Sequence, residues 1–85
     1  MGNVALLKFY GTIGGGSWDS VTASWKVPEQ YRPPMTLYVP LGCTNGASGT
    51  GQLMVGADGT LRAGNQGGAG STDERWGAVT WCVAL

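Results

Sequence analysis

Histidine is absent from this chain of 85 residues, and charged side chains are few. Without histidine the chain lacks the usual general base of nucleophilic catalysis and the commonest metal ligand. Five basic and five acidic residues give a formal net charge of zero, whereas phosphate recognition needs clustered lysine and arginine. These absences argue against a metal site and against a nucleic-acid partner.

The remaining nucleophiles and carboxylates do not form a recognisable catalytic set. Ser17 and Ser20 have no histidine to deprotonate them. Asp73 and Glu74 are adjacent, so they do not flank a glycosidic bond as the two carboxylates of a glycosidase do. We therefore expect no enzyme, no catalytic residue, no cofactor and no bound metal.

Long apolar runs and helical patterns are also missing. No apolar segment approaches the roughly 20 residues that span a bilayer, so we expect no membrane insertion. No stretch of ten residues combines helical apolar spacing with freedom from glycine, proline and β-branched residues. The chain is therefore not expected to contain α-helices.

Glycine and bulky apolar residues are both plentiful. The 16 glycines make up nearly a fifth of the chain, against a usual share of about 7%. Twenty-six residues are Val, Leu, Ile, Met, Phe, Trp or Tyr, including four tryptophans, and disordered chains are poor in such residues. A domain of this size buries only a little over about 60% of its unfolded surface. Because its own core is marginal, we expect oligomerisation to supplement it.

Alternating apolar residues between glycine-rich loops predict a single all-β domain over residues 1–85. The pattern indicates a small antiparallel β-sandwich or barrel of about six strands. The expected strands are 4–10, 21–27, 35–43, 52–55, 60–63 and 76–85.

Details of the pattern predict where each strand lies. Segment 4–10 is apolar on both faces, which suggests that it is covered on both sides. Segment 21–27 alternates strictly and places Trp25 in the core. Pro40 has no N–H, so it indicates an edge or a bulge. Asp58-Gly59 predicts a tight hairpin turn. Leu85 is expected to be packed.

Three tryptophans and two cysteines have more specific expectations. Trp81 falls on the inward phase of its strand and is expected in the core, whereas Trp18 and Trp76 border glycine-rich or polar loops. Cys43 and Cys82 are each expected to be buried as small apolar side chains, with free thiols as the default and one intrachain disulfide left open.

The central part of the chain contains an ordered series of short motifs. In order, they are Val27-Pro28, Tyr31-Arg32-Pro33, the apolar segment Leu37 to Leu41, Gly51-Gln52-Leu53-Met54-Val55, the turn Asp58-Gly59, and Leu61. From Val21 to Leu85 the chain resembles a module at the C-terminal ends of bacteriophage tail fibres and other phage adhesion proteins.

That resemblance implies a β-sandwich head that assembles as a homotrimer and recognises host cell-surface saccharides. It also implies the C-terminal tip of a longer fibre protein, located in the virion and assembled in the host bacterial cytoplasm. Tyr31, Arg32, Pro33, Asp58 and Gly59 are expected to be structural: Arg32 can reach a carbonyl or a carboxylate, and the prolines stiffen the connection between sheets.

Saccharides are bound by aromatic faces that meet C–H patches, together with polar side chains that satisfy hydroxyl groups. Residue type and position in loops nominate one set of ligand-binding candidates. The set comprises Trp18, Asp19, Asn65, Gln66, Asp73, Arg75 and Trp76.

Two other functions remain open at this stage. The first is a structural trimerisation or capping domain, or a capsid-fibre tip, with no ligand of its own. The second is a monomeric carbohydrate-binding module of a secreted bacterial enzyme.

Overall fold

The computed structural model describes residues 3–13, 18–43, 51–67 and 73–83, which form an all-β structure. One short 3-10 helix, η1 (Glu29–Tyr31), interrupts the strands, and these ranges contain no helix that could cross a membrane. The strands are β1 (Asn3–Thr12), β2 (Ser20–Thr22), β3 (Leu37–Pro40), β4 (Gly42–Cys43), β5 (Gly51–Val55), β6 (Leu61–Asn65) and β7 (Glu74–Val83).

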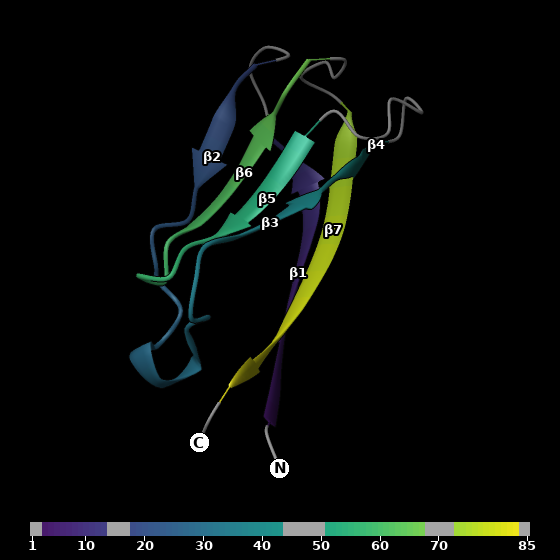
Figure 1. Ribbon diagram of the computed structural model, residues 1–85. Helices are drawn as coiled ribbons and strands as arrows, with labels where there is room; N and C mark the ends of the chain where they lie inside the picture. Colours follow the sequence, from purple (N-terminus) through teal and green to yellow (C-terminus); the bar gives the residue numbers. More distant parts are fainter. Residues whose placement is uncertain (1–2, 14–17, 44–50, 68–72, 84–85) are drawn as a thin grey trace.

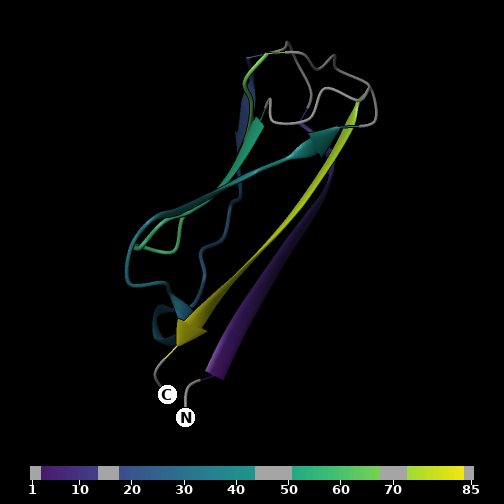
Figure 2. The same ribbon diagram turned by 45° about the vertical axis from the view of Figure 1, so that its right-hand side comes forward.

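The strands form two antiparallel sheets (Figures 1 and 2). The three-stranded sheet has the order β1-β7-β4, and the four-stranded sheet has the order β2-β6-β5-β3. Asn3 lies opposite Val83 in the register of β1 with β7, so the first and last described residues lie side by side at one end. The prediction of an all-β antiparallel structure is confirmed, and the two sheets favour the sandwich over the barrel.

The expected strand 35–43 is divided between the two sheets, so the described ranges contain seven strands where about six were expected. Pro40 ends β3, the outer strand of the four-stranded sheet, as its missing N–H predicts. Leu41 then carries the chain across to β4 and packs against Gly77, where an added Cβ would lie 2.7 Å from Leu41 Cδ2. The absence of a side chain at Gly77 therefore leaves room for this crossing.

The core lies between the sheets and includes the inward residues of β7, as predicted. Trp81 is buried, and its indole Nε1 donates a hydrogen bond of 2.7 Å to the backbone carbonyl of Tyr31. This bond ties η1 to the three-stranded sheet. The buried apolar cluster comprises Val27, Leu41, Leu53, Val55, Leu61, Ala63, Val79, Trp81 and Val83.

The prediction for segment 21–27 is wrong beyond Thr22. The backbone N–H of Ala23 donates a hydrogen bond to the carbonyl of Leu61, and the backbone N–H of Val27 donates one to the carbonyl of Gly59. Between these two bonds the first segment advances by four residues, whereas the segment that it faces advances by only two. The two extra residues break the alternation between these anchors. Trp25 consequently leaves the core, and 58% of it is exposed.

Two further expectations of burial are wrong for the single chain. Val4, Leu6 and Tyr10 on the outer face of β1 are exposed, so this strand is covered on one side only. Cys82 is exposed because it shares that outer face, whereas Cys43 is buried on the inner face. Both thiols are free. Leu85 lies outside the described residues.

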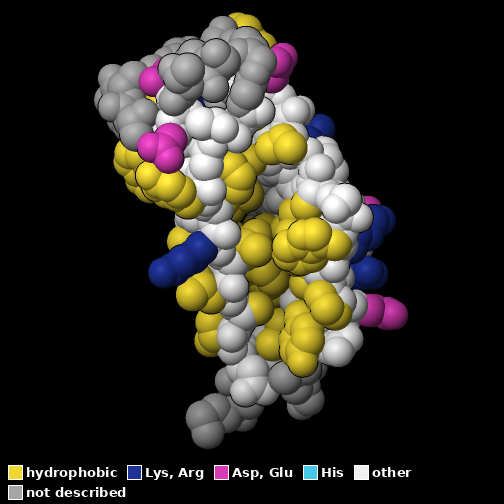
Figure 3. Space-filling model, turned by 180° about the vertical axis from the view of Figure 1, so that it is seen from behind, with side chains coloured by type: hydrophobic (Ala, Val, Ile, Leu, Met, Phe, Trp, Pro, Cys, Tyr) yellow, Lys and Arg dark blue, Asp and Glu magenta, His cyan; other side chains and the backbone are white. Residues whose placement is uncertain are grey.

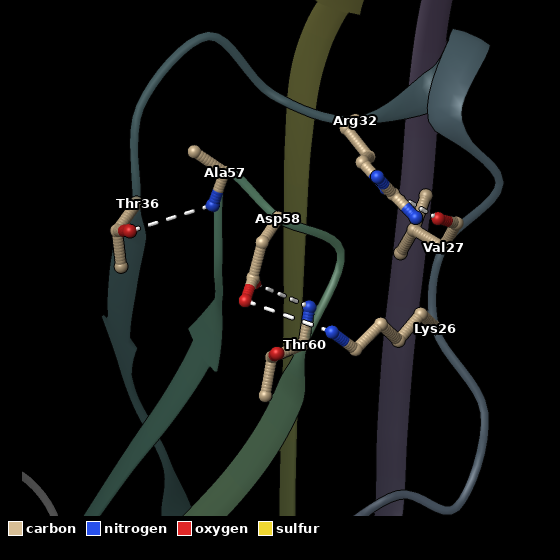
Figure 4. A network of polar contacts seen from close by, with 7 residues as sticks. All are labelled: Lys26, Val27, Arg32, Thr36, Ala57, Asp58 and Thr60. Carbon is tan, nitrogen blue, oxygen red and sulfur yellow. Dashed lines mark hydrogen bonds and ion pairs between the residues drawn. The ribbon is translucent and has the colours of Figure 1, made fainter.

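The two structural motifs of the sequence meet at the turn between β5 and β6 (Figure 4). Arg32 Nε donates a hydrogen bond of 2.8 Å to the carbonyl of Val27, which confirms that Arg32 reaches a carbonyl. Val27 in turn donates its N–H to the carbonyl of Gly59 at 3.0 Å. Gly59 has φ +91°, which favours glycine. The Tyr31-Arg32-Pro33 segment therefore clamps the Asp58-Gly59 turn.

Asp58 fixes the same turn from its outer side. Its Oδ1 accepts a hydrogen bond of 3.0 Å from the backbone N–H of Thr60, and its Oδ2 lies 3.7 Å from Lys26 Nζ. The hydrogen bond from Thr60 is the main cause that lowers the pKa of Asp58 from 3.8, and Lys26 adds a smaller effect.

Replacing Gly59 with alanine should strongly destabilise the domain. An added Cβ would lie 2.6 Å from Arg32 Nε and 2.7 Å from the Val27 carbonyl, and the left-handed conformation adds strain. Together these effects should lower the free energy of unfolding by more than about 2 kcal/mol. Gly64→Ala is the matched control, because its nearest neighbour would be Ser20 Cβ at an ordinary 3.5 Å. Urea denaturation that shows equal losses for the two variants would contradict the clamp.

Acid should remove the stabilisation that Asp58 provides. Because folding lowers the pKa of Asp58 below 3.8, its contribution is present above that pH and is lost as the pH falls through the folded value. Wild type should therefore exceed Asp58→Asn in stability near neutral pH, and the difference should shrink toward about pH 2. Urea denaturation of both proteins across this range measures it. A difference that is independent of pH would contradict the assignment.

Candidate functional site

The candidate binding residues gather at the end of the sandwich opposite Asn3 and Val83, which we call the loop end. Thr12 and Glu74 pair at that end of the three-stranded sheet, and Gly51 pairs with Asn65 at that end of the four-stranded sheet. The candidates come from three places along the chain: 18–19, 65–66 and 73–76. The structure thus brings together segments that are more than 40 residues apart in sequence.

Trp18 and Asp19 lie beside the end of β6. The backbone N–H of Asn65 donates a hydrogen bond of 2.8 Å to the carbonyl of Asp19. The six-membered ring of the Trp18 indole lies beside Gly67, where an added Cβ would be 3.4 Å from Trp18 Cζ2. Trp18 is nevertheless 75% exposed. Its ring is therefore placed by its neighbours and still presented to solvent.

Arg75 lies inside the loop end and connects the two sheets. It is fully buried on the inner face of β7, and its Nε donates a hydrogen bond of 2.5 Å to Asn65 Oδ1 on β6. Its Nη2 lies 3.4 Å from the carbonyl of Gly67. An added Cβ on Gly51 would be 2.6 Å from Arg75 Nη1, so the guanidinium also lies against β5.

The predicted direct contact of Arg75 and Asn65 with a ligand does not fit their burial. Both side chains are in the interior, where a charged group is stabilised by hydrogen bonds to fixed polar partners. Through Asn65 and Gly67 they hold the two backbone positions that place Asp19 and Trp18. Arg75 and Asn65 are therefore positioning residues for the exposed ones.

Gln66 lies on the surface beside this buried pair. Its Nε2 donates a hydrogen bond of 3.0 Å to Gln52 Oε1 on β5. That bond leaves Gln66 Oε1 and Gln52 Nε2 outside it, so the pair presents both an acceptor and a donor. Gln52 was not among the sequence candidates, although the hairpin register that Asp58-Gly59 predicts places it opposite Gly64, near Gln66.

Trp76 faces away from Arg75, on the outer face of the three-stranded sheet. It pairs in register with Tyr10 and contacts Gly42 of β4, whose missing side chain makes room for the indole. Tyr10 donates a hydrogen bond to the Glu74 carboxylate, and this contact raises the pKa of Tyr10 above 10.0. The sequence analysis missed Tyr10, because only the register of β1 with β7 brings it to Trp76.

Asp73 is half-buried directly before β7. Across the described ranges, no group of three histidine, cysteine or acidic residues is placed to hold a metal ion.

Comparison with known proteins found no matching family model, no matching curated protein and no matching solved structure. The resemblance to phage adhesion modules therefore stays a prediction from the motifs between residues 21 and 85.

Removing the Asn65 side chain should destabilise the loop end. Asn65→Ala takes away the acceptor of the buried Arg75 Nε, and a buried charged donor without this bond should cost about 2 kcal/mol or more. Gln66→Ala is the control, because it removes an exposed amide and should change stability by no more than about 0.5 kcal/mol. Urea denaturation followed by tryptophan fluorescence compares them. Equal stability of the two variants would show that the buried contact does not hold the sheets together.

Proposed function

We propose that the domain is a receptor-binding head of the phage tail-fibre kind, which adheres to host cell-surface saccharides through Trp18. The observation that carries this proposal is the exposed Trp18 ring, held beside Gly67 at the loop end. A pyranose presents a patch of C–H groups that packs on an aromatic face, and an indole supplies the largest such face in proteins.

The amide pair beside Asn65 supplies the polar half of such a site. Gln66 and Gln52 are exposed and already joined by a hydrogen bond. Because this bond restricts both side chains in the free protein, they lose less conformational entropy when a ligand binds. Their outward donor and acceptor can each satisfy one sugar hydroxyl. The residues that would contact the ligand, Trp18, Gln52 and Gln66, are uncharged, so the chemical class that fits them is a neutral saccharide.

The geometry also suits display at a tip. The chain enters at Asn3 and leaves at Val83 on one end of a body that is 41 Å long. Trp18 lies beside Gly67 at the loop end, which is the end opposite the two marked termini in Figure 1. A domain attached through either terminus therefore presents Trp18 away from its attachment. Several copies on one fibre would raise weak binding at each site through multivalency. The homotrimer implied by the resemblance stays a prediction.

A structural domain without its own ligand is the second candidate function. The exposed apolar residues Val4, Leu6 and Tyr10 on β1 favour it, because large exposed apolar patches mark interaction surfaces. In that case the exposed indole of Trp18 would contact another protein of the assembly instead of a saccharide.

Saccharide adhesion is tested with labelled protein on a glycan array and on intact bacterial cells. Trp18→Ala should reduce the amount of labelled protein bound to the array and to the cells roughly tenfold or more. This is the effect of losing about 1.4 kcal/mol of binding free energy from stacking between the indole and the sugar. Tyr38→Ala is the control, because Tyr38 is an exposed aromatic on the outer face of the four-stranded sheet. Trp76→Ala in parallel shows whether the Tyr10–Trp76 surface takes part.

Retention that is unchanged in Trp18→Ala would refute the assigned site. A wild-type protein that binds no glycan and no cell would refute saccharide adhesion as a whole and leave the structural function.

A further inference from the structure

The long outer edge of β1 sets this strand apart from the other described strands. β1 is at one edge of its sheet and pairs with β7 over ten residues on the other side. The other edge strands in the described ranges are β2, β3 and β4, with three, four and two residues. Only β1 offers an edge long enough to pair with a strand of its own length.

Both faces of this edge strand are apolar, and its protection against pairing is slight. Proteins usually shield exposed edges with charges, prolines or bulges. Within β1 the sequence has one charged residue, Lys8, and no proline. Val4 and Leu6 are exposed on the outer face, and Leu7 and Phe9 are only partly buried on the inner face. The single chain thus leaves apolar surface on either side of an open backbone edge.

An apolar groove follows the inner side of the same edge. It consists of two adjoining hollows of about 210 and 290 Å³, which share Leu7 and Trp25. Figure 3 shows hydrophobic side chains gathered along a hollow on this side of the molecule. The groove lies between β1 and the segment from β2 to η1, and it includes the exposed Trp25 and Tyr31.

We propose that the β1 edge pairs antiparallel with the β1 edge of a second copy of this chain, related by a two-fold axis. The pairing would join the two three-stranded sheets into one continuous sheet and close both grooves against each other. A two-fold contact uses the same surface on both copies, which agrees with β1 being the one long edge among the described strands.

Charge excludes one register of this contact, and the Val4–Tyr10 pair favours another. In an antiparallel pair, directly opposite residues share a face, so a two-fold axis passes beside a residue that meets its own copy. Centring the pair on Lys8 would place two lysines opposite each other, which is unfavourable. Centring it on Leu7 places Leu7 against Leu7, Lys8 against Leu6, and Val4 against Tyr10. The last pair is of the β-branched and aromatic kind that stabilises sheets.

The area of the contact is that of a stable dimer. β1 has ten residues, so its edge is about 33 Å long. Across a depth of 17 to 23 Å, each copy would bury on the order of 560–760 Å², and two copies roughly 1,100–1,500 Å² in total. Stable interfaces bury roughly 1,200–2,000 Å². The proposal is independent of saccharide binding at the loop end, because its residues lie along β1 and not at Trp18. It is an alternative to the homotrimer that the phage resemblance implies.

Light scattering and native mass spectrometry of the full chain test the state of assembly. We expect a mass of two chains at concentrations on the order of tens of micromolar. A mass of one chain at those concentrations, or of three, would overturn the proposal. The latter result would agree instead with the homotrimer that the phage resemblance implies.

A charge exchange tests the register. Leu6→Lys places lysines opposite Lys8 in both halves of the dimer and should weaken dimerisation roughly tenfold or more. Adding Lys8→Glu to Leu6→Lys should restore it, since each lysine then faces a glutamate. Tyr38→Lys is the matched control, because Tyr38 and Leu6 are each 58% exposed, and it should leave dimerisation unchanged. No weakening by Leu6→Lys, or no rescue by the double variant, would contradict the Leu7-centred register.

Disulfide trapping gives a second, independent readout. In a Cys82→Ser background, Leu7→Cys should form covalent dimers under mild oxidation, because the two Cα atoms would be about 4.5–5.5 Å apart. Lys8→Cys is the control, since its two Cα atoms would be those of diagonal neighbours, about 7–8 Å apart. Equal or faster trapping in Lys8→Cys would overturn the register, and circular dichroism confirms that each variant retains its strands.

Discussion

The antiparallel pairing of β1 with β7 is the constraint on which the rest of the structure depends. It extends over ten residues, whereas the next longest pairing, between β5 and β6, has five. This long ribbon sets the length of the domain and brings Asn3 to Val83 at one end. At the other end it fixes Arg75 and Trp76, and so determines where the loop end lies.

Alternation along β7 separates the buried and the exposed parts of the loop end. Arg75 faces the interior and reaches Asn65 and Gly67 across the sandwich, whereas Trp76 faces outward beside Tyr10. Neighbouring residues of a strand point to opposite faces of the sheet. The buried contact between the sheets and the exposed aromatic surface are therefore formed by consecutive residues of β7. The buried contact supports the backbone beside Trp18, which carries the proposed adhesion surface.

The open side of the sandwich reflects the limited size of the chain. The five shorter strands in the described ranges cover one face of β7 but leave β1 at an edge, with apolar residues on both of its faces. The composition points to this shortage, since a small domain buries a modest share of its surface. The sheet order determines where apolar surface stays uncovered. It places β1 opposite the short β2, and the groove lies between these two strands.

Local chemistry in the sequence determined the strand character, the Asp58-Gly59 turn, the edge position of Pro40 and the inward phase of Trp81. Each of these depends on neighbouring residues, on a missing N–H or on backbone conformations that glycine alone adopts freely. Tertiary structure decided that Trp25 leaves the core and that Trp18 lies beside Gly67. It also decided that Cys82, expected to be buried, is exposed, and that Arg75, expected to contact a ligand, is buried. These outcomes depend on which strands pair and in which register, and such contacts between distant segments leave no periodic signal in the sequence.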